Sequence, residues 1–291
     1  MTDLYVLHGE LPKLDGPVLV IAMQGWIDAS SAAAAALGTI EQQCDVAAVV
    51  TFDSDQLIDY RARRPVMELR DGVNTRLVWQ DIELKVGTDP AGHPVLTLTG
   101  PEPDSQWRGF AASVAALAQR LGVSHAVALG AYPFACPHTR PSRLSSSSPS
   151  ADVVAGLPFL KNSVDVPAGM SAVLEHALTE AGIPSLGLWV QVPHYVSAMA
   201  YPAASAALLD GLREVTGIAV PHDDLDTAAG MMRERIDQLV AANDDHRTMV
   251  EQLEVAYDAL TDESMSLGTT DLPTGDDLAA EFERFLRDQP D

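Results

Sequence analysis

The sequence predicts an α/β fold with a mostly parallel sheet, an antiparallel insertion and C-terminal helices. Apolar runs of strand length alternate with helical segments along most of the chain, and a sustained heptad pattern begins only near its end. With 291 residues, 47% of them hydrophobic, the chain can form one large domain and an appendage. We therefore expect an α/β domain over residues 1–222, a helical hairpin or long helix over 223–262, and an acidic, partly disordered tail over 263–291.

The N-terminal segments predict a strand–helix–strand unit. The continuous apolar run Val18–Met23 is typical of a strand that is covered on both faces. An alanine-rich helix over about residues 29–43 should follow, with Asp28 or Ser30 as its N-cap, and residues 46–52 should form the next strand. Such a unit implies a parallel, right-handed crossover.

The middle of the chain changes to short β-like segments that are separated by turn signals. They predict antiparallel strands inserted into or extending the sheet, at residues 66–70, 74–79, 82–86 and 94–99. Beyond them we expect helices at 105–121, 168–181 and 202–215, and buried strands at 124–131 and 186–192. Residues 141–150 are rich in serine and proline, which makes them the best candidate for a mobile loop.

The C-terminal part carries a heptad seam. Mostly apolar residues at alternating spacings of four and three run from Leu225 to Leu260, and the polar segment Asn243–Asp245 interrupts them midway. Either one long helix carries polar seam positions, or two helices fold back as a hairpin with a turn at this segment. We favour the hairpin, because Asp245 can cap a second helix.

The composition argues against several classes of partner. The formal net charge is -23, with 18 Lys and Arg against 41 Asp and Glu, which disfavours nucleic acid and an anionic membrane surface. The N-terminus lacks the pattern of a signal peptide, and no apolar run is long enough to span a bilayer, so we expect a cytoplasmic protein. Neither of the 2 cysteines belongs to a zinc-binding pattern, and we expect no metal and no cofactor.

Four unusual segments each follow the C-terminal end of a predicted buried strand. They are residues 25–28, 53–65, 137–140 and 193–195, and together they offer Asp, Arg, His and Tyr side chains. In open α/β sheets, ligands bind outside the carboxyl ends of the strands. The four loops could therefore meet in one cleft or line one surface.

The segment 53–65 is the densest charge cluster of the chain. Its candidate binding or interface residues are Asp53, Asp55, Asp59, Tyr60, Arg61, Arg63 and Arg64. The arginines could grip a phosphate or carboxylate in a bidentate manner. The alternative is a salt-bridge network between loops or between subunits. The sequence has no glycine-rich phosphate loop, so we favour the network.

Catalytic arrangements find little support. His138 and His194 follow prolines after strands and could act as general bases, although a structural histidine is the commoner case. A thiol nucleophile at Cys136 beside His138 lacks an identifiable orienting group. Glu102 and Asp104 could pair as acid and base, but their proline-rich context favours a rigid loop. We therefore predict no catalytic residue.

The motifs as an ordered set resemble a known family, the prokaryotic, actinobacterial branch of the proteasome-assembly chaperone 2 family. The motifs that carry the resemblance are Gly25–Ala29, Phe52–Asp55, Asp59–Pro65, Gly100–Asp104 with Trp107, Pro137–Pro141 and Val192–Tyr195. The resemblance spans about residues 4–260. These motifs also contain the remaining candidates for binding or interface roles: Trp26, Asp28, Glu102, Asp104, Trp107, His138, Thr139, Arg140, His194 and Tyr195.

The resemblance implies a nucleoside-phosphorylase-like three-layer sandwich and a homo-oligomer, for which we favour a trimer. It also implies a proteasome-assembly-chaperone-like adaptor or scaffold without catalysis, with proteasome-related proteins as partners. The alternative is a protein or enzyme that binds a small molecule, such as a nucleoside, nucleotide or anion, with the strand-end loops of a phosphorylase-like fold. A purely structural homo-oligomer is the third possibility. Fold analogy alone does not choose among them.

Overall fold

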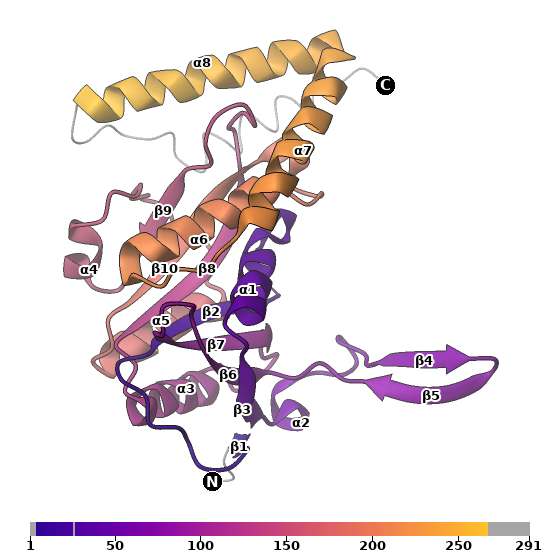
Figure 1. Cartoon of the computed structure of the whole chain (residues 1–291), viewed down its shortest axis with the longest axis vertical. Helices are drawn as coiled ribbons and strands as arrows, with labels where there is room; N and C mark the ends of the chain where they lie inside the picture. Colours follow the sequence, from indigo (N-terminus) through magenta and orange to yellow (C-terminus); the bar gives the residue numbers. More distant parts are fainter. Residues whose placement is uncertain (1–3, 26, 267–291) are drawn as a thin grey trace.

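A mixed eight-stranded sheet forms the centre of the computed structural model, which describes residues 4–25 and 27–266, with side chains to residue 260 (Figure 1). The strands lie in the order β1-β3-β6-β7-β2-β8-β10-β9. Their bounds are β1 Tyr5–Leu7, β2 Val18–Gln24, β3 Ala47–Phe52, β6 Glu83–Thr88, β7 Pro94–Pro101, β8 His125–Phe134, β9 Leu144–Ser147 and β10 Ser185–Pro193.

The four strands at the centre of the sheet, β7, β2, β8 and β10, are all parallel. Strand β3 runs in the same direction, because it is antiparallel to β6 and β6 is antiparallel to β7. The predicted strand–helix–strand unit is present, but its strands β2 and β3 do not pair, because β6 and β7 lie between them. The carboxyl ends of β2, β3, β8 and β10 therefore lie at one edge of the sheet, with β6 and β7 between β3 and β2.

Helices cover both faces of the sheet and complete three layers, as predicted. Helices α1 (Ala32–Gln43) and α6 (Pro202–Thr216) pack on one face, in a core that contains Val20 and Leu208. Helices α3 (Trp107–Leu121) and α5 (Met170–Glu180) pack on the other face, in a core that contains Ile21 and Phe110. Val20 and Ile21 belong to opposite cores because successive side chains of a strand point to opposite faces.

The serine-rich stretch is part of the sheet, so the prediction of a mobile loop over residues 141–150 was wrong. Strand β9 pairs antiparallel with β10, from Leu144 opposite Val190 to Ser147 opposite Gly187. Edge pairing needs only backbone groups, and small hydroxyl side chains fit beside it. Short helical turns complete the domain: the 3-10 turns η1 (Ala29–Ser31) and η2 (His194–Val196), and the helices α2 (Ser54–Leu57) and α4 (Ala151–Ala155).

A two-stranded arm projects from the domain beyond α2 (Figure 1). It consists of β4 (Val66–Arg70) and β5 (Val73–Val78), which pair with each other and not with the main sheet. The other predicted antiparallel strands, β6 and β7, belong to the main sheet. The expected antiparallel insertion is therefore divided between the sheet and the arm.

Two helices follow the domain, α7 (Asp223–Ala241) and α8 (Asp244–Ser266). The two helices are separated at Asn243, whose side-chain Oδ1 accepts the backbone N–H of Asp245 and of His246. Asn243, and not Asp245, thus caps α8. Figure 1 shows α8 turning sharply at the end of α7 and running obliquely across the top of the domain, so the two helices do not lie side by side. Most of the predicted acidic tail, residues 267–291, lies outside the described residues. None of the described helices is long and apolar enough to cross a membrane.

Candidate functional site

The loop after β3 is held by contacts among its own side chains. Asp53 caps α2, where its Oδ1 accepts the backbone N–H of Gln56 at 3.3 Å and its Oδ2 accepts the Gln56 side-chain amide at 2.6 Å. Asp55 accepts the hydroxyl of Tyr60 at 2.9 Å, and the Tyr60 ring contacts Trp79 edge to face with centroids 4.7 Å apart. These carboxylates therefore have structural partners.

Asp104 ties the same loop to the segment before α3. Its Oδ2 accepts the backbone N–H of Asp59 at 2.8 Å, and its Oδ1 accepts Nε of Arg63 at 3.3 Å. Asp59 in turn accepts the backbone N–H of Arg61 at 2.8 Å. The side chains of Arg61 and Arg64 are exposed and form no ion pair with a described residue. Within the described part of this chain, the expected network between loops includes Arg63 but not Arg61 or Arg64.

Glu102 and Trp107 fix the neighbouring loop. The buried Glu102 accepts the backbone N–H of Met170 at 2.6 Å, at the start of α5. Burial raises the pKa of Glu102, while the Met170 N–H and the Arg63 guanidinium oppose that rise. Trp107 donates its indole N–H to the carbonyl of Pro103. Glu102 and Asp104 therefore have different partners and do not form the acid–base pair considered from the sequence.

Asp28 caps helix α1. Its two carboxylate oxygens accept the backbone N–H groups of Ala33 at 2.8 Å and Ala34 at 3.0 Å. Burial raises the pKa of Asp28 despite these donors. Its neighbour Trp26, which we also proposed as a candidate, lies outside the described residues.

His138 is locked between two elements. Its ring is buried, with Nδ1 2.7 Å from the Tyr195 hydroxyl and Nε2 2.9 Å from Oδ1 of Asp237 on α7. The Tyr195 oxygen also accepts the backbone N–H of His138 at 2.8 Å. Both ring nitrogens are engaged, which argues for a structural histidine.

The next two residues bind helix α8. Thr139 donates its hydroxyl to Glu254, and Arg140 contacts Glu254 at 3.2 Å and Asp258 at 2.8 Å. The hydroxyl of Tyr257 on the same helix donates to the carbonyl of Pro141 at 2.9 Å. The loop after β8 is thus a fastening point for both C-terminal helices.

The four strand-end loops are neighbours. A Cβ atom on Gly25, after β2, would lie 3.2 Å from Nη2 of Arg63 in the loop after β3. Ser30 donates its hydroxyl to the carbonyl of Val196 and its backbone N–H to that of Ser197, after β10, and Tyr195 there hydrogen-bonds His138 after β8. Helices α7 and α8 also hold the loop after β8. His194 is exposed, and its ring contacts Tyr195 edge to face. A thiol mechanism is also disfavoured, because burial raises the pKa of Cys136 to about 12. Among the described residues no cluster of His, Cys, Asp or Glu could hold a metal ion.

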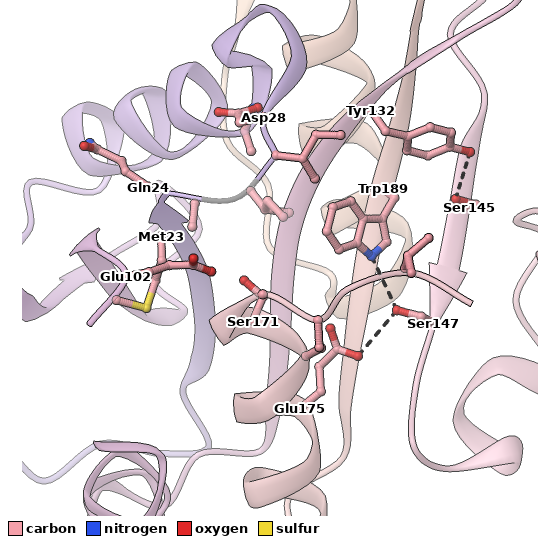
Figure 2. Close-up of a pocket in the computed structure, with 18 of the residues that line it drawn as sticks. Met23, Gln24, Asp28, Glu102, Tyr132, Ser145, Ser147, Ser171, Glu175 and Trp189 are labelled. Carbon is pink, nitrogen blue, oxygen red and sulfur yellow. Dashed lines mark hydrogen bonds between the residues drawn. The ribbon is translucent and has the colours of Figure 1, made fainter. Parts of the chain in front are cut away.

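A cavity of about 610 Å³ lies nearer the middle of the sheet, between α1 and α5 (Figure 2). Its floor comes from the C-terminal halves of β2 and β8 together with β9 and β10, and residues 162–169 pass over it. Of the candidates from sequence, Asp28 and Glu102 line it. The sequence analysis did not single out the following residues that also line the cavity: Tyr132, Ser145, Ser146, Ser147, Val164, Val166, Glu175 and Trp189.

Two glycines shape the floor of the cavity. A Cβ atom on Gly130 would lie 2.3 Å from the Trp189 ring, its neighbour across β8 and β10. A Cβ atom on Gly187 would lie 2.6 Å from the Ser147 hydroxyl and 2.7 Å from Oε1 of Glu175. Glycine inside a strand often marks such a close approach, so these two positions are the signal that sequence reasoning could have used.

Sequence comparison identifies the family of this chain. The model of the PAC2 family matches residues 22–240. The chain belongs to the PAC2 family. This result confirms the resemblance to the proteasome-assembly chaperone 2 family. No curated protein matches the chain.

Solved structures of actinobacterial proteins share the fold. Rv2714 of Mycobacterium tuberculosis, a protein of unknown function, is 34% identical with a TM-score of 0.83, over 91% of this chain and 92% of its own. Rv2125 of the same organism, a proteasome-assembly chaperone homologue, is 32% identical with a TM-score of 0.74, over 80% of this chain and 99% of its own. PbaB of Pyrococcus furiosus, an archaeal proteasome activator, is 14% identical over 81% and 97% of the chains; its TM-score of 0.61 shows only a common fold.

Proposed function

We propose that this PAC2 protein is a non-catalytic adaptor or scaffold of the proteasome-assembly-chaperone type, which works in the cytoplasm as a homo-oligomer, with a trimer favoured. The family and the relative Rv2125 support the chaperone-like part of this proposal. The strand-end loops support the absence of catalysis, because most of their acidic and histidine side chains are engaged in contacts that fasten one element to another.

The arm formed by β4 and β5 is the observation that supports a homo-oligomer. Met67 pairs with Leu77 across the two strands, and Leu69 follows on the same face. All three are roughly half exposed. An isolated two-stranded hairpin is only marginally stable in water, so an apolar face on such an arm needs a permanent cover. A second copy of the chain provides one, whereas a transient partner would leave it exposed.

Capture of proteasome subunits tests the adaptor role. Tagged full-length protein, in the lysate of a proteasome-bearing actinobacterium, should retain proteasome subunits. A variant with Met67, Leu69 and Leu77 all changed to serine should retain fewer, because the oligomer that presents the binding surface is lost. Failure of the wild-type protein to recover any proteasome subunit reproducibly under gentle conditions would contradict the proteasome part of the proposal.

The alternative of a nucleotide- or anion-binding protein is not favoured by the cavity. Its described lining contains no lysine or arginine but contains Asp28, Glu41, Glu102 and Glu175. Carboxylates repel a phosphate, and the guanidinium fork that usually grips one is missing from this lining. The cavity itself requires a separate explanation.

A further inference from the structure

The cavity has the size and shape of a binding site for a small organic molecule. Such sites commonly measure about 300–1,000 Å³, are largely apolar and carry a few well-placed polar groups. This cavity lies within that range at about 610 Å³. Its apolar lining includes Trp189 on the floor and Val164 and Val166 on the segment above it, and both valines are exposed. A ligand with an apolar body would cover these side chains.

A buried carboxylate in the cavity wall is incompletely paired within the described part of the chain. Glu175 is only 5% exposed, and its Oε1 forms no hydrogen bond with a described residue. Its Oε2 has one long contact, from the Ser147 hydroxyl at 3.4 Å. Buried polar groups in folded proteins are almost always hydrogen-bonded, so an incompletely paired carboxylate in the cavity wall calls for an explanation.

The carboxylate is held in place by the sheet. Figure 2 shows Glu175 extending from α5 toward Ser147, which also accepts the indole N–H of Trp189 at 3.4 Å. Gly187 makes room for all three side chains, because a Cβ atom there would lie within 2.7 Å of each. A glycine that makes space for an incompletely paired acid is of little use to stability alone, since a buried carboxylate without a cation is costly.

We propose that the cavity binds a small organic cation, an amine or amidine on an aromatic body, whose charge pairs with Glu175 and whose ring packs against Trp189. The cation would satisfy the unpaired carboxylate in a charge-assisted hydrogen bond, and the indole face would add a cation–π or stacking contact. Of the other acids of the lining, Glu41 pairs with Lys85, and Asp28 and Glu102 accept backbone N–H groups, so Glu175 is the acid whose hydrogen-bonding capacity is least used within the described residues. The lining also contains one residue that can carry a positive charge, His176, which follows Glu175 on α5.

Binding of two probes that differ mainly in charge tests this proposal. Full-length protein is titrated with tryptamine and with indole-3-propionate, which carry an ammonium and a carboxylate on the same indole body, and binding is followed by ligand-observed NMR and calorimetry. We expect saturable binding of tryptamine at millimolar concentration or below and no comparable binding of indole-3-propionate. Glu175→Gln keeps the shape of the side chain and should weaken tryptamine binding about tenfold or more.

A matched control removes a charge from the same helix outside the cavity. Glu180→Gln, at the exposed end of α5, should bind tryptamine like the wild type. The proposal is overturned if tryptamine fails to bind to the wild type, if Glu175→Gln binds it equally well, or if indole-3-propionate binds more tightly. Thermal unfolding of each variant shows that it is folded, so a loss of binding in Glu175→Gln reports on the site itself.

Discussion

The lock around His138 predicts a specific order of stability among variants. In Tyr195→Phe, the backbone N–H of His138 loses its acceptor and Nδ1 loses its hydrogen-bond partner. His138 is buried, so water reaches these two groups poorly. Each buried polar group left without a partner costs about 1–3 kcal/mol, which gives a loss of about 2–4 kcal/mol after some relaxation at the partly exposed Tyr195. Urea unfolding followed by circular dichroism measures this loss as a lower midpoint.

Asp237→Asn is the matched control at the other ring nitrogen. The asparagine side chain can still hydrogen-bond Nε2 of His138 through its oxygen or its amide, and its position is half exposed, so we expect a loss below about 1 kcal/mol. The reasoning is refuted if Tyr195→Phe unfolds at the wild-type midpoint, or if Asp237→Asn is the more damaging change.

Three further predictions follow from buried and paired groups. Arg140→Ala should increase hydrogen exchange in α8, where it loses Glu254 and Asp258, and should leave exchange in the central strands unchanged. Burial raises the pKa of Glu175 from 4.5 to about 7, so stability should fall as the pH rises through that window. Glu175→Gln should remove this dependence on pH and, above that window, unfold with a free energy up to about 3 kcal/mol higher than the wild type. Urea unfolding at several pH values measures both. The same pH dependence of stability in the two proteins would contradict the prediction. Burial raises the pKa of Cys44 to about 11 and of Cys136 to about 12, so alkylation should be slow until denaturant is added, whereas rapid native labelling would contradict the buried positions.

The strands and helices of the core were predictable because their apolar patterns are strong. The run Val18–Met23 and the spacing of Phe110, Val114 and Leu117 led directly to β2 and α3. Strand β9 was missed because its serines resemble a loop, and only pairing with β10 makes them a strand. Propensity is a weak guide where a neighbouring strand supplies the hydrogen bonds.

The sites were harder to predict than the fold. The charged loops stood out in the sequence, but the partners of His138 and Arg140 lie about a hundred residues away on α7 and α8. The cavity depends on Glu175, Trp189 and the glycines of β8 and β10, which no short motif connects. Only the three-dimensional arrangement of the sheet brings them together.

The central claim is that the arm joins copies of this chain, and sedimentation equilibrium tests it most directly. The wild-type protein should sediment as a multiple of the chain mass, with three chains favoured. The variant with serine at Met67, Leu69 and Leu77 should sediment as a monomer. In the single chain about half of each of these side chains is exposed, and covering that half in an interface contributes about 1 kcal/mol per side chain. Arg70→Ser, on the opposite face of the arm, should keep the wild-type mass. A monomeric wild type, or a triple variant that keeps the full mass, would contradict the account.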